Sequence, residues 1–214
     1  MFDTKNAPLI KICGLQRQID IKIVNEYKPD FIGFVFYPKS KRYVSFKKAM
    51  ELKSNLNPKI KSVGVFVNED ISNIVSLVKS QCIDVVQLHG NEDNAIIQKL
   101  KSNINVPIIK AFLYKDDPTF KKSLASKSDL ILLDTGFGTG SCFNWDSLKY
   151  IDRQYMLAGG IGLDNIDKAL KLKPLGLDVS SKLEIDGFKD ENLIKSFMSK
   201  INDYKHHLNN TRYG

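Results

Sequence analysis

Residues 62–89, SVGVFVNEDISNIVSLVKSQCIDVVQLH, contain the smallest unit from which the fold can be argued. Two short apolar runs, SVGVFV (62–67) and VVQLH (85–89), flank the segment DISNIVSLVKS (70–80). Short apolar runs of this kind are typical of buried strands. The middle segment repeats apolar residues at helical spacing behind Asp70, a favourable N-cap residue. The stretch therefore predicts a strand, a crossover helix and a second strand parallel to the first.

The same pattern recurs along nearly the whole chain. Six further apolar runs are LIKIC (9–13), FIGFVF (31–36), PIIKAF (107–112), LILLDT (130–135), YMLAG (155–159) and LDVSS (177–181). Successive runs start 22 to 31 residues apart, which leaves room for one helix in each interval, although the segment after LILLDT leaves room for only a short one. Eight such units favour an α/β fold that closes into a single (β/α)8 TIM barrel, with an open doubly wound sheet as the alternative.

The end of the domain follows from the last helical pattern. DENLIKSFMSKINDY (190–204) places apolar residues at helical spacing behind Asp190, another good N-cap residue. No stretch rich in Pro, Gly or Ser divides the chain. We expect one TIM-barrel domain over residues 1–208 and a frayed tail over residues 209–214.

Composition and charge argue against several classes of protein. Only four of the 32 basic residues are arginines, and the lysines behind the net charge of +8 are spread over predicted helix faces. Nucleic-acid binders concentrate their charge, so we expect a small anionic substrate and no nucleic-acid partner. No apolar run is long enough to cross a bilayer, and no membrane partner is expected. Three widely spaced cysteines, and an N-terminal MFDTKNAPL without an apolar core, predict a reduced, cytoplasmic protein.

In a barrel of this kind the functional groups gather where the strands end. AGGIG (158–162) and DVSSK (178–182) place glycines and serines after the last two strands, where the backbone can approach an anion closely. Loops in these two positions are the usual phosphate cradle of the architecture. Ordinary turns would need similar residues, but the two loops together favour a phosphate site.

Ionisable groups also interrupt two apolar strands. Because side chains alternate along a strand, Ile10 and Ile12 share one face, and Lys11 and Cys13 point together to the other. Asp134 ends the apolar run LILLD. An aspartate there can cap the following loop, or it can act as a general acid if a dry site raises its pKa.

Metal and dinucleotide sites find little support. The histidines, His89, His206 and His207, lack the spacing of a zinc site, and we expect His89 to be a hydrogen-bonded strand-end residue. DTGFGTG (134–140) lacks the third glycine of a dinucleotide fingerprint and predicts a loop that closes over substrate. Cys82 is expected to pack in the core.

Seven groups of residues resemble the motifs of the phosphoribosylanthranilate isomerase family. They are KICG (11–14), FIGFVFYPKSKRYVS (31–45), VGVFVN (63–68), VQLHGNE (86–92), DTGFGTG with FNW (134–145), LAGGI (157–161) and DVSSKLE with GFKD (178–190). KICG or GGI alone would be weak evidence. The ordered set spans nearly the whole chain, and it is this order that makes the resemblance specific.

The resemblance implies an isomerase of tryptophan biosynthesis that needs no metal or organic cofactor. The family's reaction is an Amadori rearrangement, in which N-(5-phosphoribosyl)anthranilate becomes 1-(2-carboxyphenylamino)-1-deoxyribulose 5-phosphate. One group must protonate the ring oxygen of the sugar, and another must remove the proton from its C2. On the family pattern, Asp134 is the general acid and Cys13 is the general base.

The resemblance also implies how the substrate is held. Arg42, in KSKRY, matches the residue that binds the anthranilate carboxylate, for which a guanidinium is well suited. The residues that match the phosphate cradle are Gly160, Ser180 and Ser181. Asp178 matches a position near the ribose.

Lys11 calls for a separate hypothesis, because it shares a strand face with Cys13. It could supply positive potential that favours the thiolate. It could instead complete an ion pair in the barrel floor with an inward carboxylate, for which Asp134 and Asp178 are the candidates.

The chain departs from the family pattern at three places. Gln16 stands where the family usually has threonine, Lys182 where it usually has glycine, and Ser141-Cys142 where a basic residue often follows GTG. Lys182 could add charge near the phosphate, or its Cβ could crowd the backbone. None of these departures touches the expected acid, base or arginine.

Other functions stay open on the residues alone. Another phosphosugar barrel would want lysine and glutamate groups, or metal ligands, at its strand ends. A non-catalytic phosphoanion-binding barrel would not need Cys13 and Asp134 together. A nucleic-acid binder would show steep salt dependence. No oligomerisation face is evident, so we expect a monomer or a homodimer.

Overall fold

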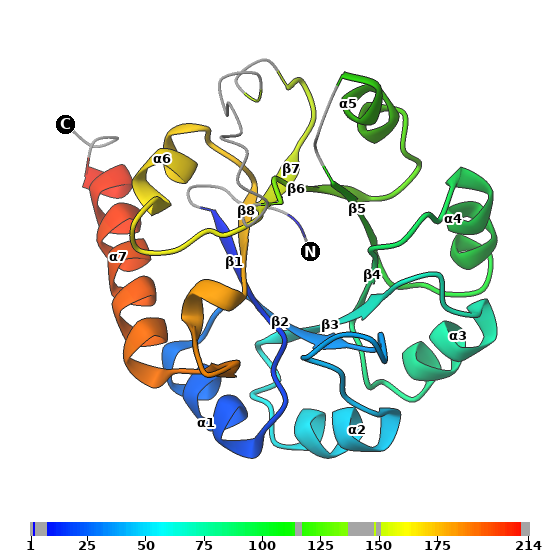
Figure 1. The fold of residues 1–214 in the computed structure, drawn as a ribbon, viewed down its shortest axis with the longest axis horizontal. Coiled ribbons are helices and arrows are strands. Elements are labelled where there is room, and N and C mark those ends of the chain that lie inside the picture. The colour runs from blue at the N-terminus through cyan, green and yellow to red at the C-terminus, as the bar shows by residue number, and fades with distance from the viewer. Residues whose placement is uncertain (1, 3–7, 114–116, 137–147, 149–150, 211–214) are drawn as a thin grey trace.

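Eight parallel strands close into a barrel in the computed structural model, which describes residues 2, 8–113, 117–136, 148 and 151–210 (Figure 1). Each strand pairs with the next along the chain, and β8 closes the barrel on β1. The strands are β1 (Leu9–Cys13), β2 (Phe31–Val35), β3 (Lys61–Phe66), β4 (Val85–Leu88), β5 (Ile108–Leu113), β6 (Leu130–Asp134), β7 (Tyr155–Ala158) and β8 (Gly176–Val179). The predicted (β/α)8 TIM barrel is confirmed.

Helices surround the barrel on its outside (Figure 1). They are α1 (Gln18–Tyr27), α2 (Phe46–Ser54), α3 (Ile71–Lys79), α4 (Asn94–Lys101), α5 (Asp117–Leu124), α6 (Ile166–Lys171) and α7 (Glu191–Asn210). A short 3-10 helix, η2 (Ser181–Leu183), and a hairpin of β9 (Glu184–Ile185) and β10 (Phe188–Lys189) lie between β8 and α7. None of the helices in the described part of the chain combines the length and apolar character needed to cross a bilayer.

The strands sort their side chains into two layers, as a period of two residues requires. Ile10 and Ile12 are fully buried among the residues between barrel and helices. Lys11 and Cys13 point into the barrel. The apolar residues of that inner layer are Phe31, Val35, Val63, Val65, Val85, Ile109, Ala111, Leu130, Leu132, Met156, Ala158 and Leu175. With these side chains packed inside the barrel, the expected place for a ligand site is its mouth.

The helix starts agree in part with the expected caps. The backbone N–H of Leu193 donates to Asp190 Oδ1 at 2.9 Å, so Asp190 caps α7 as predicted. Asp70 does occupy the N-cap position of α3, but its side chain makes no capping hydrogen bond there. The expectation for Asp70 was therefore right in position and wrong in contact.

The element boundaries lie close to the predicted ones. Every strand begins and ends within two residues of its predicted bounds. The short helix expected after β6, and the DTGFGTG loop beyond Gly136, lie outside the described residues. Helix α7 continues to Asn210, so the frayed tail expected from residue 209 is helical over its first two residues. Residues 211–214 lie outside the described part.

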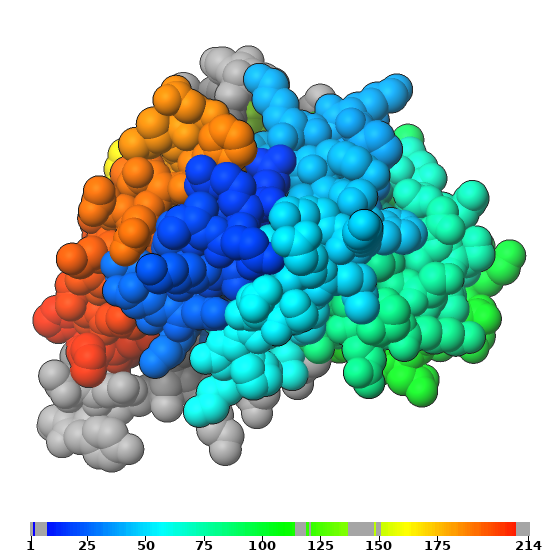
Figure 2. Space-filling view, turned by 90° about the horizontal axis from the view of Figure 1, so that it is seen from below, coloured from blue at the N-terminus to red at the C-terminus, as the bar shows by residue number. Residues whose placement is uncertain are grey.

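Three segments meet at one side of the barrel mouth. The side-chain amide of Gln16 donates to the backbone oxygen of Lys41 at 2.9 Å. Arg17 Nη2 donates to the backbone oxygen of Lys189 at 2.8 Å. The loop after β1 therefore joins the loop after β2 to the β9–β10 hairpin, and in Figure 2 the blue region lies between the light-blue and orange ones.

Candidate active site

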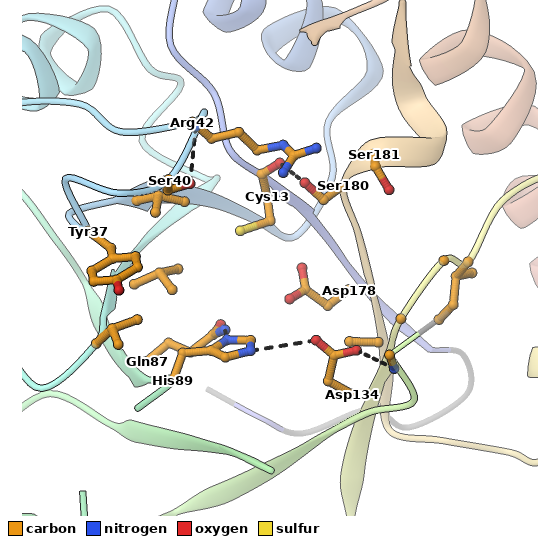
Figure 3. A pocket seen from close by; sticks show the side chains of 18 residues that line it. Cys13, Tyr37, Ser40, Arg42, Gln87, His89, Asp134, Asp178, Ser180 and Ser181 are labelled. Atoms are coloured by element: carbon orange, nitrogen blue, oxygen red, sulfur yellow. Dashed lines mark hydrogen bonds and ion pairs between the residues drawn. The ribbon is translucent and has the colours of Figure 1, made fainter. Parts of the chain in front are cut away.

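The carboxyl ends of the strands surround a cavity of about 500 Å³, a size typical of small-molecule sites. Seven residues that the sequence singled out line it, namely Cys13, Arg42, Asp134, Gly160, Asp178, Ser180 and Ser181. Figure 3 shows the polar ends of Cys13, Asp178 and Asp134 pointing into this space. Lys11 is fully buried and bonded to Asp178. All of the predicted site residues thus meet in one place.

The thiol of Cys13 is half-buried at the end of β1. A Cβ added to Gly33, on the neighbouring strand β2, would lie 2.6 Å from the Cys13 Sγ, so a bare glycine makes room for the thiol. Gly14 has a φ of +86°, which favours glycine, and turns the chain beside the side chain of Arg42. The Ser180 hydroxyl donates to the backbone oxygen of Cys13 at 3.0 Å and links β1 to β8.

Lys11 forms the ion pair that one of the two hypotheses expected. Its Nζ lies 2.9 Å from both carboxylate oxygens of Asp178. Burial lowers the pKa of Lys11, but Asp178 and Cys13 raise it by more, so the ammonium stays charged. Lys11 also acts on Cys13, as the other hypothesis proposed, and lowers the thiol's pKa.

The net effect on Cys13 nevertheless differs from that hypothesis. Burial is the largest influence and raises the pKa of the thiol, and Asp178 raises it too. Lys11 and Lys189 lower the pKa without offsetting burial. In the free protein Cys13 therefore holds its proton more tightly than an ordinary cysteine. Lys11 reduces the rise in the thiol's pKa that burial causes, but it does not cancel that rise.

Both carboxylate oxygens of Asp134 have partners. The backbone N–H of Gly136 donates to Oδ1 at 2.9 Å, and His89 Nε2 lies 3.5 Å from Oδ2. Burial raises the pKa of Asp134, but these two partners lower it by more, so the pKa lies below its ordinary value. Asp134 thus caps the following loop, the first of its two possible roles. The condition named for the second role, a pKa raised by a dry site, is not met in the free protein, because the favourable contacts outweigh desolvation.

His89 is a hydrogen-bonded strand-end residue, as predicted. Its Nδ1 lies 3.0 Å from Nε2 of Gln87, a residue of β4 whose side chain lines the same cavity. The sequence analysis did not single out Gln87. A polar residue between Val86 and Leu88, on the inward face of β4, was the available signal.

Arg42 is held by a carboxylate of the chain itself. Its Nε lies 2.6 Å from Glu184 Oε1, and its Nη2 lies 2.5 Å from Oε2. Lys189 contacts the same carboxylate and lies 3.2 Å from the backbone oxygen of Ser180. Burial raises the pKa of Glu184, but Arg42 and Lys189 lower it by more. Two cations around one anion leave positive charge at the cavity rim.

Neither Glu184 nor Lys189 was recognised from the sequence as a site residue. Both lie in quoted motifs, DVSSKLE and GFKD, but nothing in their local pattern shows that they meet Arg42. Their signal was a charged residue near the end of β8 and another in the hairpin that follows.

The expected phosphate loops follow the neighbouring strands β7 and β8 and line the same cavity. Gly159 and Gly160 have φ values of +99° and +66° after β7, and they line the cavity together with Ser180 and Ser181. Asn165 fixes the glycine loop, because its Oδ1 accepts from the N–H of Gly162 at 2.9 Å and its Nδ2 donates to the Gly160 oxygen at 3.0 Å.

Two departures from the family pattern have structural partners. Lys182 Nζ pairs with Asp164 Oδ2 at 3.0 Å, and a Cβ added to Gly162 would lie 2.8 Å from the Cβ of Lys182. The Lys182 side chain is therefore accommodated against a bare glycine and neutralised on the surface. Gln16 uses its amide to reach Lys41, as described above. Ser141 and Cys142 lie outside the described residues.

A second cavity, of about 800 Å³, opens beside α4 and α5, and His89 lines both cavities. At its edge the buried Lys110 Nζ lies 3.0 Å from Glu92 Oε2, and Glu92 accepts from the N–H groups of Asn68 at 2.7 Å and Gly90 at 2.9 Å. This pair braces the loops after β3 and β4. Among the described residues, no group of three His, Cys, Asp or Glu side chains could hold a metal ion.

These groups suit a reaction that moves protons on an anionic substrate. A thiol and a carboxyl line one cavity, a cation stands at its rim, and two loops offer backbone and hydroxyl donors. General acids and bases need such placement before they need a particular pKa.

The chain is similar to known proteins over most of its length. The family model described as N-(5'phosphoribosyl)anthranilate (PRA) isomerase matches residues 10–200. An N-(5'-phosphoribosyl)anthranilate isomerase of Endomicrobium trichonymphae is 47% identical over 193 residues, covering 87% of this chain and 94% of the relative.

Solved structures agree with this result. The phosphoribosyl anthranilate isomerase of Thermotoga maritima superposes with a TM-score of 0.83 at 34% identity, over 92% of this chain and 99% of the other. A phosphoribosyl anthranilate isomerase in complex with reduced 1-(o-carboxyphenylamino)-1-deoxyribulose 5-phosphate has a TM-score of 0.82 at 32% identity, over 92% and 99% of the two chains.

Proposed function

This chain belongs to the N-(5'-phosphoribosyl)anthranilate isomerase family, and on that basis we propose how its residues carry out the family reaction. It is an isomerase of tryptophan biosynthesis. The reaction converts an aldosylamine into a 1-amino-1-deoxyketose, so one proton must reach the ring oxygen and another must leave C2.

The position of Cys13 and Asp134 on the wall of one cavity is the observation that supports their roles. The carboxylic acid of Asp134 gives its proton to the ring oxygen. The C1–O bond breaks, its electron pair stays on that oxygen, and the anilino nitrogen forms a C=N bond. The thiolate of Cys13 then takes the proton of C2 to give the enolamine, which tautomerises to the ketone. The substrate thus gains at oxygen the proton that it loses at carbon.

The free protein holds this pair of groups in the opposite protonation state. The raised pKa of Cys13 and the lowered pKa of Asp134 put the shared proton on sulfur. The reactive state, with a thiolate and a carboxylic acid, carries the same number of protons and the same net charge. Cys13 must therefore lose its proton, and Asp134 must gain one, before the substrate reacts.

The remaining residues hold the substrate at its two charged ends. Arg42, already fixed by Glu184, binds the anthranilate carboxylate at the cavity rim. The phosphate lies against the two neighbouring loops after β7 and β8, with Gly160, Ser180 and Ser181 as its donors. Asp178 lines the cavity between these ends and is the candidate partner of the ribose, with Lys11 beneath it as its counter-ion.

The setting of the reaction follows from the same family. A small anionic phosphosugar is the partner, as in the relative solved with a reduced product analogue. The Thermotoga maritima isomerase is described as dimeric, so a homodimer as well as a monomer is compatible with this fold. Free thiols at Cys13 and Cys82 agree with a reducing, cytoplasmic compartment.

Binding of the reduced product analogue tests the assignment of the substrate-holding residues. Arg42→Met and Ser180→Ala should each weaken binding by about 10-fold or more, since each loses a hydrogen bond to a charged group. Cys13→Ala should bind within about 3-fold of wild type, because the thiol acts on C2 and holds no charge of the ligand. Unchanged binding in Arg42→Met would refute the carboxylate assignment.

A further inference from the structure

A chain of three side chains leads from the inside of β4 to the acid of the reaction. The Nε2 of Gln87 lies 3.0 Å from His89 Nδ1, and His89 Nε2 lies 3.5 Å from Asp134 Oδ2 (Figure 3). The Gln87 side chain is almost completely buried, with 1% of the residue exposed, whereas the His89 side chain is 34% exposed. The histidine is thus fixed at both ring nitrogens, at the wall of the cavity.

The donors and acceptors in this chain define one tautomer of His89. In this arrangement the carboxamide of Gln87 donates to Nδ1, so the proton of the neutral imidazole lies on Nε2. That proton points to the Asp134 carboxylate. A neutral histidine can therefore donate one hydrogen bond to Asp134 and accept one from Gln87.

Gln87 has an unused acceptor that fits a second state of the same histidine. Its Oε1 is buried without any hydrogen-bond partner among the described residues, a costly arrangement in a folded protein. An imidazolium carries protons on both nitrogens, so its Nδ1 needs an acceptor. A half-turn of the Gln87 carboxamide places Oε1 there, while Nε2–H of the ring still points to Asp134.

From this geometry we propose that His89 is a positioning residue that stores the proton of the general acid, and that Gln87 supports it in both protonation states. The proposal rests on the proposed role of Asp134. The imidazolium passes its Nε2 proton to the Asp134 carboxylate, and Asp134 passes a proton to the ring oxygen of the substrate. This leaves His89 neutral with its remaining proton on Nδ1, which Gln87 Oε1 accepts. Proton exchange with solvent at the partly exposed ring then restores the Nε2–H tautomer, to which Gln87 donates at Nδ1.

A proton held on His89 explains how Asp134 can act as a general acid at neutral pH. Asp134, with its contacts to Gly136 and His89, is a carboxylate at neutral pH and holds no proton to give. Histidine is the side chain that changes its protonation between about pH 5 and pH 8. A proton shared between a carboxylate and an imidazole stays available to much higher pH than one on a carboxyl alone.

The charged groups that face His89 come from four neighbouring elements. Asp134 of β6 is the direct neighbour. From β5, Lys110 is neutralised by Glu92, which follows β4. Across the cavity, Asp178 of β8 is neutralised by Lys11, and Lys122 of α5 lines the second cavity together with His89. Among the described residues named here, Asp134 is thus the carboxylate near His89 that is not paired with a lysine.

The pH dependence of kcat separates this role from a structural one. His89→Gln keeps an N–H donor for Asp134 but cannot store a proton. The ratio of wild-type to His89→Gln kcat should rise from about 1–3 near pH 5.5 to about 10 or more near pH 8, as the variant's acid loses its proton earlier. A ratio that is constant over this range would overturn the proposal, since a structural defect lowers kcat equally at every pH.

Two variants of Gln87 with similar size should act in opposite directions. Gln87→Glu offers an acceptor to Nδ1 at all times, so its activity relative to wild type should increase with pH. Gln87→Met offers neither donor nor acceptor, so its relative activity should decrease with pH. Equal pH profiles of the two variants would contradict the role of Gln87. If Asp134→Ala kept full kcat, the acid assignment itself would fail, which is a different result.

A direct measurement of the tautomer needs no turnover. The chain has three histidines, so the side-chain nitrogen signals of uniformly labelled protein can be assigned by comparison with His89→Gln. We expect neutral His89 to carry its proton on Nε2 in wild type, and to lose this preference in Gln87→Met, while His206 and His207 stay unchanged. A proton on Nδ1 of neutral His89 in the wild type would overturn the proposal.

Discussion

At the scale of single residues, the thiol of Cys13 has neighbours that act on it in opposite directions. Burial and Asp178 raise its pKa, whereas Lys11 and Lys189 lower it. The resting protein therefore protects Cys13 from reaction. Its reactivity depends on Lys11, which is the largest of the influences that favour the thiolate.

Alkylation should report this balance. Since only the thiolate reacts, we expect iodoacetamide to modify Cys13 slowly at pH 7 and faster as the pH rises into the alkaline range. Lys11→Met should slow it further at every pH. The rate is followed by mass spectrometry in a Cys142→Ser background, with the buried Cys82, whose pKa is raised to about 11, as the internal control. Faster alkylation at pH 7 than that of a free cysteine peptide would contradict the account.

The absence of a side chain at Gly33 leaves room for the thiol of Cys13. Because an added Cβ would lie 2.6 Å from Sγ, Gly33→Ala should destabilise the protein by about 1–3 kcal/mol through overpacking. In a Cys13→Ala background, which lacks Sγ, the same substitution should cost less. Denaturant unfolding of the four proteins measures the difference. An equal cost in both backgrounds would show that the thiol does not set the space at Gly33.

At the scale of elements, one kind of hydrogen bond, from a backbone N–H to an aspartate, joins three successive pairs of strands at the amino end of the barrel. The aspartate just before each of β2, β4 and β6 accepts a backbone N–H from the strand before it. The bonds are Ile10 N to Asp30, Ser62 N to Asp84 and Ile108 N to Asp129, each 2.8 Å long. The repetition ties neighbouring strands in register at the end of the barrel away from the site.

Asp84 offers the clearest test of this device, because Lys53 Nζ also lies 2.6 Å from its Oδ2. Burial raises the pKa of Asp84, but Lys53 and Ser62 lower it by more, so folding favours the carboxylate. Its contribution is therefore present above the unfolded pKa of about 3.9 and is lost as the pH falls through the lower folded pKa.

Asp84→Asn should accordingly lower the free energy of unfolding by about 1–2 kcal/mol at pH 7, because this side chain is partly exposed and screened by solvent. The difference from wild type should shrink below about pH 4. Urea unfolding at both pH values measures it, with Asp152→Asn, outside this device, as the matched control. A difference independent of pH would assign the effect to packing rather than charge.

At the scale of the whole molecule, the features that could be predicted were those that local pattern controls. Strand positions follow from apolar runs, and Cys13 and Asp134 were found because an ionisable group ends an apolar strand. Parallel strands that close into a barrel must bring such ends together. The fold, these two residues and the phosphate loops were therefore open to prediction from local pattern, whereas Arg42 and Asp178 were expected from the family resemblance.

The contacts between distant strands could not be predicted in the same way. Arg42 and Glu184 are 142 residues apart, and only closure of the barrel brings them together. The lowered pKa of Asp134 depends on His89, which follows a different strand. The local pattern around Asp134 therefore could not show that its pKa is lowered. Pairing across a barrel needs the geometry of the closed sheet and not only the period of each strand.

Turnover of freshly prepared N-(5'-phosphoribosyl)anthranilate, followed by the loss of its fluorescence in the presence of a chelator, tests the central claim most directly. The claim is that Cys13 and Asp134 transfer the two protons. Wild type and the control Cys82→Ala should turn over alike, whereas Cys13→Ala and Asp134→Ala should each lose about 10²-fold or more in kcat. Wild-type kcat in either of these two variants would contradict the claim and place the proton transfers on other groups.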